Sequence, residues 1–154
     1  MVQSSLTKEL IHKDTGDGLI IILPWAYHSI TQGTFAYSAS TAEYFNGGYY
    51  NSTNAEGDQI DYKVWLSKGV WQLSLGFCNS YVYSAMYLIL LDSVLQGQID
   101  PYDCRGMYWG GMNGPLYVPS TGIHTLSLKA WRGIAGNDYR YMYFNSIVLD
   151  RREA

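Results

Sequence analysis

Charged residues are scarce in this 154-residue chain. Asp, Glu, Lys and Arg make up 15% of the sequence, against roughly 25% in an average soluble domain. The formal net charge is −3, and the basic residues form no cluster longer than the pair Arg151-Arg152. Nucleic-acid binding, which depends on neutralising phosphates, is therefore not expected.

Long apolar runs are also missing. The runs 19–23 and 87–91 are much shorter than the ~20 residues that a membrane-spanning helix needs. The first residues, MVQSSLTKELIHKD, lack the basic start and apolar middle of a secretory signal. We expect no membrane association, and no export by that route unless a signal has already been removed.

Cysteine is nearly absent, with Cys78 and Cys104 as the two examples. A chain with an ample core does not need a disulfide, so we interpret them as free, buried thiols and leave pairing open. No CxxC pair or neighbouring histidine completes a metal site. We therefore expect no metal and no cofactor, and synthesis in a reducing compartment.

Aromatic residues are abundant, with 15 tyrosines and 5 tryptophans among 47% hydrophobic residues. Such residues favour strands and are enriched at interfaces and at platforms that stack on sugars. The length suits one domain. We expect a flexible or partner-docking arm over residues 1–17 and a single folded domain over residues 18–154.

Alternation of apolar and polar residues predicts strands throughout that domain. In 59–66 and 70–77 every second residue is apolar, and 67–69 between them reads as a hairpin turn. Residues 86–91 are all apolar, which predicts a strand that is covered on both faces or lies in the middle of a sandwich. We count roughly eight to ten strands and no substantial helix, so the predicted fold is an all-β, antiparallel β-sandwich of jelly-roll type.

Residues 101–119 have a different composition. Four glycines and the aromatics Tyr102, Tyr108, Trp109 and Tyr117 follow no packing period. We interpret this stretch as a loop that displays aromatic side chains for contact.

Catalytic motifs are missing from the sequence. His12, His28 and His124 have no HxH or HExxH spacing, and neither GxSxG nor GxxxxGK[ST] occurs. His124 lies in an alternating strand, where a core or sheet-surface histidine is the simpler reading. The candidate carboxylates are assigned to turns or strand ends, where they would bind the turn backbone; they are Asp58, Asp61, Asp92, Asp100 and Asp103. We expect no enzymatic activity.

Three segments resemble a known family: GVWQLSLG (69–76), LILLDSVLQGQID (88–100) and TGIHTLSLKAW (121–131). They resemble galactose-binding-like jelly rolls, including carbohydrate-binding modules, and more closely a domain of tailed-phage virion surface proteins. DQIDYKVWLSKGVWQL also resembles a segment of that phage group. The family usually has Gly after the Leu-Asp turn, where this chain has Ser93.

The resemblance implies a structural protein of a virus particle, a decoration or head-fibre subunit at the virion surface. Its partners would be the major capsid protein or another virion protein, and further copies of itself, with a trimer favoured. The alternative is a carbohydrate-binding module that binds a glycan. An enzyme fragment ranks third, because no acid-base pair is evident. The candidate contact residues are Tyr102, Tyr108, Trp109, Trp131, Tyr139 and Asn145; the alternative for each aromatic is packing in the core or on a sheet.

Overall fold

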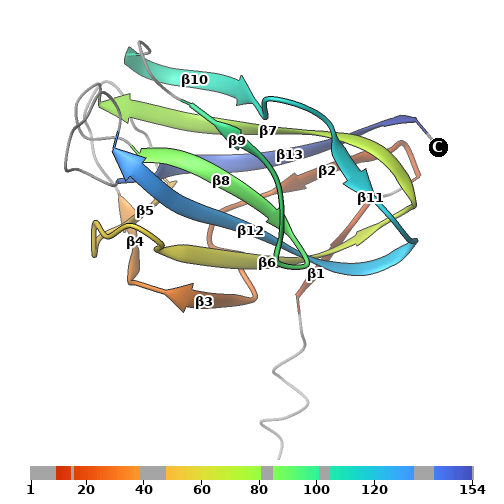
Figure 1. Ribbon diagram of the computed structural model, residues 1–154, viewed down its shortest axis with the longest axis horizontal. Coiled ribbons are helices and arrows are strands. Elements are labelled where there is room, and N and C mark those ends of the chain that lie inside the picture. Colours follow the sequence, from red (N-terminus) through yellow and green to blue (C-terminus); the bar gives the residue numbers. More distant parts are fainter. Residues whose placement is uncertain are drawn as a thin grey trace, which may run out of the picture.

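The computed structural model describes residues 10–14, 16–38, 48–80, 85–100, 105–133 and 141–153. Within these ranges the chain is all-β, with two sheets packed face to face (Figure 1). They contain no helix, and so none that could span a membrane. The predicted β-sandwich is confirmed, but the described residues form 13 strands rather than eight to ten. The excess comes from short segments that the alternation pattern did not resolve.

The first sheet, sheet A, is built around the strands that the sequence predicted most clearly. Its order is β1 (Ile11–Lys13), β6 (Gln59–Leu66), β12 (Gly122–Gly133), β8 (Ala85–Leu91) and β9 (Val94–Ile99), with β3 (Ser29–Gln32) also paired to β6. β1 runs parallel to β6, and the other pairs are antiparallel.

The second sheet, sheet B, contains the longest pairing among the described residues, between β7 and β13. Its order is β10 (Arg105–Gly111), β7 (Gly69–Ser80), β13 (Tyr143–Glu153), β5 (Gly48–Asn51) and β4 (Phe35–Ser38). In addition, β11 (Leu116–Val118) pairs with β7, and β2 (Leu19–Ile22) pairs with β13. All these pairs are antiparallel.

The core lies between the sheets and follows the predicted period of two. The largest fully buried side chains come from both sheets and include Trp71, Tyr62, Tyr87 and Phe144. Burial of alternate residues on each strand leaves the other face of each sheet for solvent or for contacts.

The predicted hairpin at 67–69 is wrong. β6 belongs to sheet A and β7 to sheet B, so the chain crosses between the sheets there. Both strands bury every second residue, and they can do so facing each other across the core as well as side by side in one sheet. Alternation alone does not distinguish these arrangements.

β8 lies inside the sandwich, between β12 and β9 of sheet A, as one of the two readings of 86–91 predicted. Its other face is only partly covered, because Met86 is buried but Leu88 and Leu90 are half-buried. Another prediction needs correction. Residues 101–119 are not a loop throughout, since 105–111 and 116–118 form β10 and β11 and pair with β7. An unpaired edge of β7 accepts these strands although their sequence lacks a clear alternation.

Part of the predicted N-terminal arm forms a strand. Residues 11–13 of the range 1–17 form β1 on sheet A, and residues 1–9 lie outside the described ranges.

Candidate functional site

The structure places the predicted contact residues in several different regions. Tyr102 and Tyr139 lie outside the described residues. Tyr108 and Trp109 are in β10, where their backbones pair with Phe77 and Gly76 of β7. Their roles in binding therefore stay predictions.

Trp131 and Asn145 lie on different sheets. Trp131 is near the end of β12 in sheet A, and Asn145 is in β13 of sheet B; both side chains are half-buried. Asn145 lies at a bulge between Phe144 and Ser146, and its Oδ1 accepts a hydrogen bond of 2.9 Å from Ser146 Oγ. A local contact of this kind explains Asn145 without a ligand.

The β4–β5 hairpin carries an aromatic site that the sequence reading missed. Tyr49 and Tyr50 are consecutive in β5, so they point to opposite faces of sheet B. Tyr37 of β4 is directly opposite Tyr49, and Tyr143 of β13 is directly opposite Tyr50. Two features of the sequence could have indicated these contacts: the consecutive tyrosines in a strand, and the spacing of Tyr141 and Tyr143.

Tyr27, Tyr37 and Tyr49 form what we call the edge tyrosine cluster. Tyr49 packs partly against the core, and the ring centroids of Tyr27 and Tyr37 lie 6.2 Å and 6.5 Å from its own, at interplanar angles of 54° and 68°. Tyr37 is 62% exposed. Burial, and to a smaller extent the Tyr27 phenol, raise the pKa of the Tyr49 hydroxyl, which therefore stays a neutral donor and acceptor. The result is a half-buried ring with an exposed ring standing edge-on to it.

Tyr50, Tyr141 and Tyr143 form the outer tyrosine cluster on the other face of sheet B. Tyr50 and Tyr143 are stacked, with centroids 5.4 Å apart and planes at 18°. Tyr141 is tilted against both rings, at 6.0 Å from Tyr50 and 5.6 Å from Tyr143. All three residues are half-buried.

A buried polar cluster adjoins both sets of tyrosines. Asn51 is 0% exposed; its Nδ2 donates to Asp58 Oδ2 at 2.9 Å, and its Oδ1 accepts from Met142 N at 2.5 Å. Asp58 Oδ2 also accepts from Thr53 Oγ1 and Ala55 N. Asn51-Ser52-Thr53 matches a glycosylation acceptor. In the folded chain, however, the Asn51 amide is buried and held by two hydrogen bonds, so it is not accessible to modification.

Asp58 leaves little room for its neighbours. A Cβ added to Gly33 would lie 2.3 Å from Asp58 Oδ1 and 2.6 Å from Thr53 Oγ1, and Gly33 has φ +84°. Asp58 Oδ1 is buried without a hydrogen-bond partner. Ala55 N donates to the carboxylate of Asp58, so the predicted turn role of Asp58 is confirmed. The positive φ of Gly33 and its closeness to Asp58 require glycine at that position.

Asp61 was placed at a turn or strand end, and this is wrong, because it lies within β6 and is only 3% exposed. Its carboxylate accepts four side-chain hydrogen bonds, from Ser29, Thr31, Gln59 and Ser127. Burial raises the pKa of Asp61, but these four donors outweigh that effect and hold the pKa below its ordinary value. A fully paired carboxylate of this kind serves the sheet rather than a ligand.

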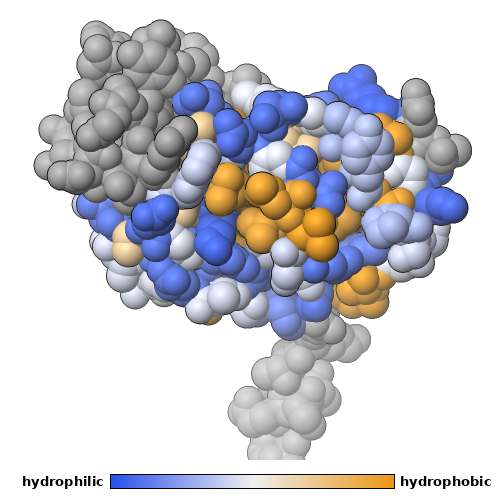
Figure 2. Space-filling view, viewed as in Figure 1, coloured by the Kyte–Doolittle hydropathy of each residue, from blue (hydrophilic) through white to orange (hydrophobic). Residues whose placement is uncertain are grey.

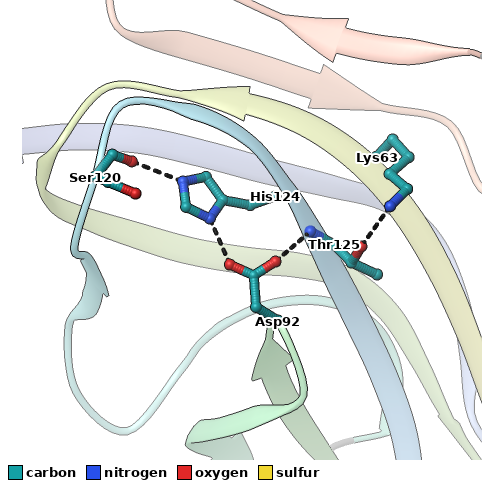
Figure 3. A network of polar contacts seen from close by, with 5 residues as sticks. All are labelled: Lys63, Asp92, Ser120, His124 and Thr125. Atoms are coloured by element: carbon teal, nitrogen blue, oxygen red, sulfur yellow. Dashed lines mark hydrogen bonds and ion pairs between the residues drawn. The ribbon is translucent and has the colours of Figure 1, made fainter.

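Asp92 and His124 join the β8–β9 turn to β12 (Figure 3). His124 Nδ1 is 2.6 Å from Asp92 Oδ2, its Nε2 is 2.7 Å from Ser120 O, and Asp92 Oδ1 accepts from Thr125 N at 2.8 Å. Partial burial raises the pKa of Asp92, but the bonds from Thr125 and His124 and the charges of His124 and Lys63 bring it below its ordinary value. Both nitrogens of His124 are engaged by acceptors, so this pair holds a turn and activates no nucleophile.

The described part of the chain contains no group of three or more His, Cys, Asp or Glu side chains that could hold a metal ion.

Aliphatic side chains are exposed on both sheets. Figure 2 shows apolar residues gathered in the middle of one face, over β8 and β9, where Leu90 is paired with the exposed Leu95. On sheet B, the exposed Leu19 and Ile21 alternate with buried residues of β2, and Leu23 follows them. Such surfaces suit contact with protein better than contact with a polar ligand.

Comparison with known proteins identifies the fold alone. No protein-family model matches the chain, and no curated protein is similar in sequence. Solved structures do match, and carbohydrate-binding modules are among them. One is a CBM36 domain of a multidomain xylanase from the hindgut metagenome of Trinervitermes trinervoides (TM-score 0.67, 13% identity, covering 88% of this chain and 99% of that chain).

Two further structures have the same fold. A CBM36 module in complex with calcium and xylotriose has a TM-score of 0.65 and 12% identity, covering 84% of this chain and 98% of that one. A family 35 module from Clostridium thermocellum has a TM-score of 0.59 and 16% identity, covering 84% and 96%. The chain therefore has the jelly-roll fold of carbohydrate-binding modules, and the predicted jelly-roll class is confirmed.

Proposed function

We propose that this protein is a non-catalytic glycan-binding module and that the edge tyrosine cluster is its binding surface. One observation carries the proposal: the ring of Tyr37 is largely exposed while it rests edge-on against the half-buried Tyr49. An exposed aromatic face offers a flat apolar surface for the C–H face of a sugar ring. Phenol hydroxyls beside it donate and accept hydrogen bonds with sugar hydroxyls.

The fold and the chemistry of the described residues support this proposal. The fold is the one that carbohydrate-binding modules use, although the low identity leaves the ligand of this chain to its own residues. The Asp92–His124 pair has both ring nitrogens engaged, so it offers no free base for catalysis.

A glycan array followed by calorimetry tests the proposal. We expect binding to at least one polysaccharide class, among xylans, mannans, β-glucans and host surface glycans, and no release of reducing ends. A blank array together with no retention on insoluble polysaccharides would contradict it.

The second candidate is the virion decoration subunit, and the exposed aliphatic residues favour it. Leu19, Ile21 and Leu23 on sheet B and Leu95 on sheet A are suited to contacts with a capsid protein or with further subunits. This function would place the protein on the virion surface as a trimer. Light scattering at micromolar concentration and co-sedimentation with capsids test it; a monomer that does not sediment with capsids would remove its support.

A further inference from the structure

We infer that Asn51 is a positioning residue that fixes both tyrosine clusters at once, and that Asp58 holds it in place. The effect of Asn51 on glycan binding rests on the proposed function, whereas its effect on the positions of the rings does not. Asn51 ends β5 directly after Tyr49 and Tyr50, and Met142, to which it is bonded, lies directly between Tyr141 and Tyr143. One buried amide therefore adjoins a residue of each cluster.

The link to the edge tyrosine cluster runs through the β4–β5 hairpin. Asn51 pairs with Phe35 in the same register that sets Tyr37 opposite Tyr49. Beyond Asn51, Ser52 N donates to Thr34 O at 2.8 Å, and Thr34 N donates to Thr53 Oγ1 at 3.0 Å. These bonds hold the open end of the hairpin, so a shift of Asn51 changes the spacing of the two rings.

The link to the outer tyrosine cluster runs through β13. The bond from Met142 N to Asn51 Oδ1 fixes the chain just before β13, where Tyr143 pairs with Tyr50. Side chains on either side of a strand residue point away from its own side chain, so the rings of Tyr141 and Tyr143 share the opposite face from the buried Met142. The hydrogen bond that anchors Met142 therefore sets how the rings of Tyr141 and Tyr143 lie against Tyr50.

Asp58 determines which way the Asn51 amide points. The carboxylate oxygen accepts, so Asn51 must turn its Nδ2 toward Asp58 and its Oδ1 toward Met142 N. Asp58 is itself fixed to sheet A, because its carbonyl accepts from Ala130 N at 2.8 Å and Gly57 N donates to Ala130 O at 2.7 Å. Asp58 thus connects the tyrosine clusters of sheet B to β12 of sheet A.

Two isosteric variants separate this role from general stability. Asp58→Asn weakens the acceptor for Asn51, whereas Asp61→Asn alters a carboxylate that is also buried and hydrogen-bonded, but whose side-chain partners belong to neither tyrosine cluster. We expect Asp58→Asn to shift the aromatic ¹³C signals of Tyr37, Tyr49, Tyr50, Tyr141 and Tyr143. The signal of Tyr117, on β11, should stay in place, and Asp61→Asn should leave all of them in place.

Shifts confined to one cluster, or equal shifts in both variants, would overturn the inference. Hydrogen exchange on the unmodified protein gives an answer even if Asp58→Asn does not fold. We expect the amide of Met142 to exchange in the same slow step as the paired amides of β5. Fast exchange at Met142 with protected β5 amides would overturn the inference equally.

Glycan affinity then connects this role to the proposed function. We expect Asp58→Asn to weaken binding by about tenfold, the lower end of what losing an outer hydrogen-bond partner costs at metal sites, and Asp61→Asn to leave binding unchanged. If Asp58→Asn leaves affinity unchanged, positioning for binding is overturned. If no glycan binds but the ring signals move as described, the proposed function fails and the positioning role stands.

Discussion

His124 and Asp92 form a 2.6 Å contact in which the buried imidazole, 5% exposed, holds a turn residue of left-handed conformation. Asp92 and Ser93 both have positive φ, at 50° and 68°. Hairpin turns of this kind favour glycine. The carboxylate bonds to His124 and Thr125 offset the cost of the strained backbone at Asp92, and nothing comparable is seen for Ser93.

Ser93→Gly is expected to stabilise the protein by about 0.5–1 kcal/mol, because glycine adopts positive φ without steric cost. Urea unfolding measures the change. Ser74→Gly, in the middle of β7, serves as the control and should destabilise, since strand glycines cost conformational entropy. A loss of stability in Ser93→Gly would contradict the turn geometry.

Gly33→Ala is expected to destabilise by about 2–4 kcal/mol, from a strained φ and a clash with Asp58. The matched control is Gly114→Ala, because a Cβ there meets nothing within 4 Å. Thermal unfolding compares the two variants. Equal melting temperatures of the two variants would contradict this prediction, because they would show that the residues around Asp58 accommodate an added methyl group.

Acid should weaken the fold through Asp61. Its pKa is lowered in the folded state, so its contribution is present above the unfolded value of about 3.9 and is lost as pH falls through the folded pKa. Asp61→Asn should therefore be less stable than the unmodified protein at pH 7, with a gap that narrows below about pH 4. Ser127→Ala, which removes one donor, should show part of this effect. A gap that stays constant down to pH 2 would contradict the assignment.

The sequence predicted the sandwich because burial in a sheet needs only a local period of two, which β6, β7 and β12 display. It could not predict which sheet each strand joins, and the supposed β6–β7 hairpin failed for that reason. The outer tyrosine cluster was missed because Tyr50 and Tyr143 meet through the pairing of β5 with β13, which is distant in sequence. The edge tyrosine cluster was missed because Tyr37 lies opposite Tyr49 only in the register of β4 and β5. The consecutive Tyr49 and Tyr50 are visible in the sequence, whereas the prediction for 101–119 rested on its glycine and aromatic content.

Glycan binding by Tyr37→Ala, compared with Tyr117→Ala, tests the central claim most directly. The two tyrosines are 62% and 61% exposed, on β4 and β11, so neither change should alter stability by more than about 0.5 kcal/mol. With a glycan identified on the array, Tyr37→Ala should weaken binding by at least about tenfold, as expected for a central aromatic contact. Tyr117→Ala should bind as the unmodified protein does. Unchanged affinity in Tyr37→Ala, or an equal loss in both variants, would contradict a binding site at the edge tyrosine cluster.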